Sequence, residues 1–184
     1  MSGYERIIAE MLNEFPKFRL VEKKKSFLMK AINVFLLIIT FGKMKTFMKS
    51  FTTTLGYTVY TPEKWEESFD RIGILKHERV HMRQMREYGR IWFSVSYLFL
   101  WFPCVFAYFR KKYEQEAYTE TLRHSAKTYG IKYVESTFLR ESIISSFTSA
   151  SYFWTWPFRK SIEAWYDETV NSIRLEQGLA ATKR

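Results

Sequence analysis

The sequence predicts a mainly α protein (α+β) that carries one small β-strand unit. In several segments of the 184-residue chain, apolar residues recur every three to four positions, which is the periodicity of an amphipathic helix. The segment Phe51–Tyr60 differs, because threonine and aromatic residues dominate it and these favour extended structure. Hydrophobic residues make up 47% of the chain, which is enough for a packed core and excludes a disordered protein.

The expected helices are separated by residues that end or cap a helix. Pro16 ends the first helix, and Gly42, Gly89 and Gly178 stand where a left-handed cap is expected. The helices predicted in this way cover residues 4–15, 27–41, 72–88, 113–126, 136–148 and 159–176.

The strand segment contains a glycine and is followed by a proline. Gly56 predicts a bend or bulge within the extended segment. Pro62 predicts a further helix start, with Thr61 as its N-cap.

The chain is strongly basic. Its 29 lysines and arginines against 19 acidic residues give a net charge of +10, which attracts nucleic acid, acidic lipid headgroups or an acidic protein. Aromatic residues make up 19% of the chain, a share that favours an apolar surface patch. The composition leaves two alternatives: peripheral membrane or nucleic-acid contact, or a place in a larger assembly, and a simple solvated basic surface. No nucleic-acid recognition motif is present.

The single cysteine and the N-terminal residues limit which disulfides and which cellular compartment are expected. With Cys104 alone, the chain can form neither an internal disulfide nor a cysteine-rich zinc module. The first fifteen residues include acidic side chains and no apolar core of a secretory signal, so an intracellular location is expected.

The segment His77-Glu78-Arg79-Val80-His81 carries the most specific chemical signal. Histidines four residues apart lie one helical turn above each other, so both imidazoles can reach one metal ion. Glu78 is rotated by about 100° from His77, which makes it a poor ligand but a suitable proton acceptor. The spacing predicts a zinc site in which Glu78 is the catalytic base.

A catalytic zinc site needs a third protein ligand and an open position for water. The segment Tyr113–Tyr118 offers carboxylates on a later predicted helix. At this point the sequence resembles the gluzincin class of zinc metallopeptidases, in which a glutamate from a later helix completes a His-His-Glu site.

This sequence can be aligned with the gluzincin signature in two ways, which place different glutamates at the third ligand position. The pattern Glu114-x-x-Ala117 is similar to the Glu-x-x-Ala-Asp signature of gluzincins and implies Glu114 as the ligand. A Glu-x-x-x-acid spacing instead implies Glu116 with Glu120 behind it. Tyr118 stands where the signature has an aspartate that orients a ligand histidine, so Tyr118 and Glu120 are the candidates for supporting a ligand.

A wider resemblance covers roughly residues 51–120. The order FTTTLGYTVYTP, HERVHMRQ and YEQEAY is similar to small uncharacterised metallopeptidase-like proteins of phages and bacteria. It implies a bacterial cytoplasm, a phage-infected cytoplasm or a virion as the setting. In zincins an edge strand pairs with the substrate backbone, so Phe51–Tyr60 is either that strand or a structural hairpin. Gln84 either faces the site, where it holds a ligand or substrate, or faces solvent.

The uncharged run Ile91–Phe109 is about long enough to cross a bilayer. A single crossing would put His81 and the YEQEAY glutamates on opposite sides of the membrane. If they share a metal, the run must go out and come back as an apolar hairpin, and Pro103 can break it into two arms. The hairpin either packs in the core or dips into one leaflet.

These observations predict one zincin-like domain over residues 1–184. It would consist of N-terminal helical and apolar segments (1–50), a metal-site core (51–126) and C-terminal helices (127–184). The expected activity is that of a zinc metallopeptidase, a hydrolase that cleaves a peptide or protein substrate with a zinc-bound water and the base Glu78. The alternatives are a non-catalytic binding or structural protein that zinc stabilises, and a protease recruited to DNA by its charge.

Overall fold

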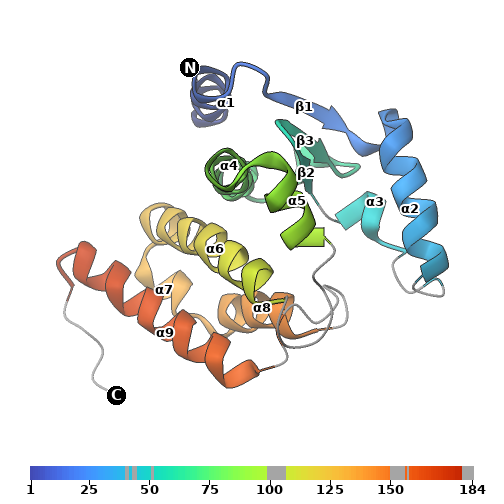
Figure 1. Ribbon diagram of the computed structural model, residues 1–184. Coiled ribbons are helices and arrows are strands. Elements are labelled where there is room, and N and C mark those ends of the chain that lie inside the picture. Colours follow the sequence, from blue (N-terminus) through green and yellow to red (C-terminus); the bar gives the residue numbers. More distant parts are fainter. Residues whose placement is uncertain are drawn as a thin grey trace. The chain divides into compact units, whose positions relative to one another are not determined.

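The computed structural model describes residues 1–39, 42, 45–50, 52–98, 107–149, 156 and 158–179. By internal packing the chain divides into two compact units, Met1–Arg86 and Glu87–Arg184, which are described in turn. The described elements are mainly helices with one small sheet (Figure 1), so the predicted fold class is confirmed. The single-domain organisation stays a prediction.

The first unit contains a three-stranded sheet in the order β1-β3-β2. The central strand β3 (Thr58–Thr61) pairs in parallel with β1 (Arg19–Glu22) and antiparallel with β2 (Thr53–Leu55). The helices of this unit are α1 (Gly3–Glu14), α2 (Phe27–Ile39), α3 (Phe47–Ser50) and α4 (Arg71–Tyr88), the last of which ends two residues into the second unit.

The β2–β3 hairpin forms within the segment that the sequence marks as extended. Gly56 lies in the turn with a φ of 62°, a conformation that a residue without Cβ adopts at little cost. Strand β1 was not predicted from the sequence, because it is four residues long and its partner in β3 lies far along the chain.

The helix predicted to start at Pro62 with Thr61 as N-cap was wrong. Thr61 is the last residue of β3, paired in register with Glu22 of β1, and that pairing holds it extended. Only a 3₁₀ turn, Trp65–Glu67, follows the proline. The next α-helix is α4, where the Asp70 carboxylate accepts a hydrogen bond of 2.8 Å from the backbone N–H of Gly73.

The core of the first unit lies between α1, α4 and the sheet. Burial of these side chains is the main force that holds α4 in place. The buried residues are Ile7, Met11, Phe15, Phe18, Val59, Trp65, Leu75 and Met82.

A charged cluster also ties α1 to α4. The Glu14 carboxylate accepts hydrogen bonds of 2.6 Å from Nε of Arg79 and from Nε of Arg83, and Arg86 lies 3.4 Å from it. The hydrogen bond from Arg83 is the largest cause that lowers the pKa of Glu14, to about 2. At about 100° per residue, these arginines occupy the side of α4 away from His77.

The second unit is helical. Its helices are α5 (Arg90–Leu98), α6 (Ala107–Tyr129), α7 (Ile131–Val134), α8 (Thr137–Thr148) and α9 (Arg159–Glu176), and α6 runs beside α9 in Figure 1. Its core gathers around Leu122, Ile144 and Ile162, each fully buried.

The predicted helix caps are confirmed at three glycines. Gly42, Gly89 and Gly178 have φ values of 77°, 85° and 70°, in the left-handed region that favours glycine.

The two arms of the apolar run Ile91–Phe109 pack against each other. The rings of Trp92 in α5 and Phe109 in α6 are 6.0 Å apart, and the hydroxyls of Ser96 and Tyr113 are 3.3 Å apart. A continuous helix would separate residues 92 and 109 by about 26 Å, so the run goes out and returns as predicted. Pro103 lies outside the described residues. Within the described part of the chain, no helix is both long and apolar enough to cross a membrane.

Candidate metal centre

The two motif histidines lie side by side on α4. The Nε2 atoms of His77 and His81 are 3.1 Å apart, and the two rings meet edge to face. Two nitrogens bound at about 2.0–2.1 Å to one tetrahedral zinc ion would be about 3.3 Å apart. The imidazole pair therefore has the spacing of two ligands on a single ion.

Gln84 orients one of these imidazoles. Its amide oxygen lies 2.9 Å from Nδ1 of His81, and the glutamine is buried, with 2% of its surface exposed. Since an amide oxygen only accepts, Nδ1 of His81 carries the proton and donates, which leaves the Nε2 lone pair for a metal. Of the two alternatives for Gln84, the structure places it against His81 and away from solvent.

We expect Gln84→Ala to weaken zinc binding by about 10–100-fold, because the ring of His81 loses the acceptor that fixes its tautomer and direction. Gln84→Glu keeps an acceptor oxygen and should bind zinc nearly as tightly as the wild type. Competition with a fluorescent zinc chelator measures both affinities. The exposed Gln177, which follows the last residue of α9, gives a matched control, Gln177→Ala. Equal zinc affinities of the wild type and Gln84→Ala would contradict the role of Gln84.

Glu78 is held beside the histidines by the strand β2. It is buried, with 7% exposed, and its Oε2 accepts a hydrogen bond of 2.7 Å from Oγ1 of Thr54. Thr54 pairs with Val59 in the centre of the hairpin, which fixes the position of the hydroxyl. The sequence did not single out Thr54, although the three threonines before Gly56 were a visible signal of a polar strand.

A buried lysine lies in the same unit and interacts electrostatically with Glu78. Lys23 is fully buried, its Nζ donates a hydrogen bond of 2.9 Å to the carbonyl oxygen of Phe47, and it lies 3.7 Å from the centre of that ring. Burial lowers the pKa of Lys23 to about 7, while the negative charge of Glu78 opposes that shift. In the sequence Lys23 was one member of a basic cluster, and nothing marked it as buried.

The candidate third ligands lie on α6 in the second unit. Glu114 is buried, with 8% exposed, whereas Glu116 is exposed. The ring of Tyr118 lies tilted against that of Phe147, with 5.4 Å between ring centres, and belongs to the apolar packing of its unit. Glu120 is partly buried on the same helix.

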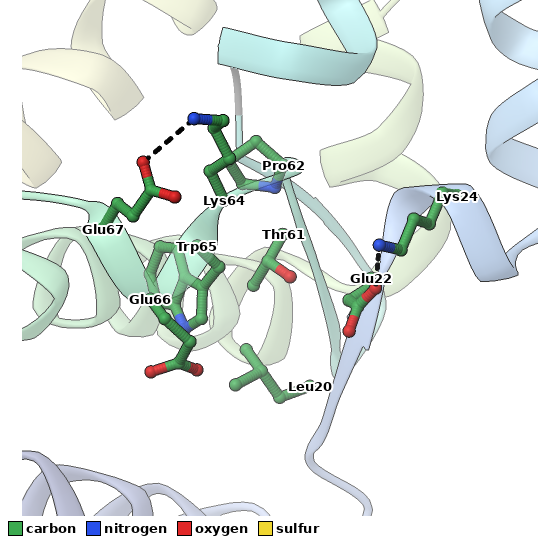
Figure 2. Close-up of a pocket in the computed structure, with 9 residues that line it drawn as sticks. All are labelled: Leu20, Glu22, Lys24, Thr61, Pro62, Lys64, Trp65, Glu66 and Glu67. Atoms are coloured by element: carbon green, nitrogen blue, oxygen red, sulfur yellow. Dashed lines mark hydrogen bonds and ion pairs between the residues drawn. The ribbon is translucent and has the colours of Figure 1, made fainter.

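A cavity of about 280 Å³ in the first unit offers no rival site. Figure 2 shows two ion pairs among its charged side chains: Lys24 lies 3.3 Å from Glu22, and Lys64 lies 3.1 Å from Glu67. Within the described residues, no histidine lines it. The remaining charged residue of the lining, Glu66, pairs with Arg71, so each charged side chain of this cavity has a partner of opposite charge.

No protein-family model, curated protein or solved structure matches the chain. Two imidazoles one helical turn apart are donors of a kind that suits zinc.

Proposed function

We propose that the protein is a zinc-dependent metallopeptidase in which His77 and His81 bind the metal and Glu78 acts as general base. The observation that carries the proposal is the 3.1 Å separation of the two Nε2 atoms, with Glu78 buried one residue beyond His77. Two histidines four apart on a helix, with the glutamate between them, are the motif by which many zinc hydrolases activate water.

We propose Glu114 as the third ligand. Its carboxylate is buried on α6, whereas that of Glu116 is exposed to solvent. This difference in burial favours Glu114 over Glu116.

The residues around the proposed metal have separate tasks. A bound zinc ion would supply Lewis acidity, which lowers the pKa of a water molecule towards about 7. Glu78 would accept the proton from that water and pass it to the leaving amine of the cleaved peptide bond. Thr54 would hold the carboxylate of Glu78 in place through its hydrogen bond to Oε2.

Metal analysis of the natively purified protein tests the proposal. We expect roughly one zinc ion per chain in the wild type and little or none in His81→Ala. The neighbouring glutamates give a matched pair: Glu114→Gln should weaken zinc binding, whereas the exposed Glu116→Gln should leave it unchanged. Circular dichroism verifies that each variant is folded.

Two outcomes would overturn the assignment. A metal-free wild type would remove the zinc site altogether. Zinc retained by His81→Ala at full stoichiometry would place the metal elsewhere. Zinc lost in Glu116→Gln but kept in Glu114→Gln would correct the third ligand alone.

A further inference from the structure

The outer face of α2 carries five large apolar side chains that are exposed to solvent. Phe27 is 87% exposed and Ile38 68%, which are unusual values for side chains of this size. The other three are Leu28, Val34 and Phe35, at 50%, 56% and 61%. Several such residues on one surface mark an interaction site, whereas single ones are common on any protein.

These side chains form one stripe. At 100° per residue, they fall within an arc of about 120° around the helix axis. Met29 lies on the opposite side and is fully buried, so α2 is attached to its unit by that side. In Figure 1, α2 stands at the end of the first unit remote from α1, with its contacts to α3 and to the 3₁₀ turn Lys23–Lys25. One side of α2 therefore packs on the first unit, and the opposite, apolar side is exposed to solvent.

Exposed lysines border this stripe. Lys24 and Lys25 immediately precede the helix, with side chains 57% and 68% exposed, and Lys30 is exposed at about 40° from the edge of the stripe. Glu22 pairs with both Lys24 and Lys25, so one carboxylate offsets only part of the positive charge of these two lysines. The surface around the stripe is positive, in agreement with the net charge of +10.

We infer that this face of α2 binds the surface of an anionic lipid membrane, with the helix lying in the interface. An apolar stripe bordered by lysines matches a bilayer surface, where acyl chains lie beneath negative headgroups. The thirteen residues of α2 are too few to cross a bilayer, which needs about 20. A second copy is a poorer occupant, because two such faces would bring like charges together.

Vesicle co-sedimentation with the full chain tests this inference. We expect strong binding to vesicles of three parts phosphatidylcholine and one part phosphatidylglycerol, and weak binding to phosphatidylcholine alone. Phe27→Ser/Phe35→Ser should lower the partition into anionic vesicles by about tenfold or more, because two aromatic side chains no longer enter the acyl region. The matched control is Phe138→Ser/Leu175→Ser, which removes two side chains of similar exposure (78% and 61%) from α8 and α9.

Separate variants test the contribution of the lysines to membrane binding. Lys24→Gln and Lys30→Gln should each weaken anionic-vesicle binding by about fivefold, and added salt should reproduce the loss. No binding by the wild type, equal loss in the control pair, or a self-association that Phe27→Ser/Phe35→Ser abolishes would overturn the inference. The last result would identify a second copy as the occupant. None of these measurements depends on zinc or on peptide hydrolysis.

Discussion

Glu78→Gln is expected to retain zinc while losing peptide hydrolysis by about 10²–10⁴-fold, the usual contribution of general acid–base catalysis. The amide has the shape of the carboxylate, and its oxygen can still accept the hydrogen bond from Thr54. It cannot take a proton from water near neutral pH. Zinc content by mass spectrometry and cleavage of a fluorogenic peptide library, measured on the same preparations, separate the two effects.

The comparison needs a glutamate outside the site. Glu67→Gln is suitable, because that side chain is 68% exposed and pairs only loosely with Lys64 on the surface. It should match the wild type in both assays. If Glu78→Gln cleaves peptides as fast as the wild type, Glu78 is not the base. If zinc is present but the wild type cleaves no peptide in the library, the alternative of a binding protein that zinc stabilises takes the place of the peptidase.

Lys23→Met is expected to raise the free energy of unfolding at pH 7 by roughly 1–3 kcal/mol. Lowering the pKa from 10.5 to about 7 means that holding the lysine in the folded protein costs several kcal/mol at neutral pH. Methionine removes that cost and fills a similar volume. It also leaves the carbonyl of Phe47 without its donor, which costs about 1–3 kcal/mol and offsets part of the gain.

The sign of the pH dependence follows from the direction of the shift. Between about pH 7 and 10.5 the unfolded chain binds more protons at Lys23 than the folded chain, so the wild type gains stability as pH rises, by at most about 1.4 kcal/mol per unit. Lys23→Met should lose this slope. Urea denaturation at pH 7, 8 and 9 measures it, with the exposed Lys24→Met as control. Parallel stability curves for the wild type and Lys23→Met would contradict the buried, largely neutral lysine.

Local pattern predicted the helices well. α1 and α9 lie within a residue of their predicted bounds, because apolar periodicity and the residues that end each helix are local signals. β1 could not be found in this way, since its partner in the sheet lies 39 positions along the chain at Arg19↔Thr58. The same pairing overrode the local signal for a helix at Thr61, which shows tertiary contact prevailing over capping preference.

The residues of the candidate site also differ in whether a local sequence pattern can predict them. His77, Glu78 and His81 follow from spacing on a single helix. For Gln84 the sequence left two alternatives, and its contact with His81 is seen only in the structure. Thr54 reaches Glu78 across 24 positions, and Lys23 reaches Phe47 across 24, so neither contact leaves a trace in a local pattern. Side chains that support a site from other elements are visible only once the chain is folded.

The Glu14 cluster makes the histidine helix dependent on the beginning of the chain. Arg79 and Arg83 lie one turn apart on α4, and Arg86 follows three residues later, a spacing at which like charges repel. The arginines on this side of α4 therefore repel one another, which destabilises the isolated helix. The carboxylate of Glu14 binds Arg79 and Arg83 and offsets that repulsion. The first fourteen residues bear none of the proposed ligands. Through Glu14 they stabilise the helix that carries His77 and His81.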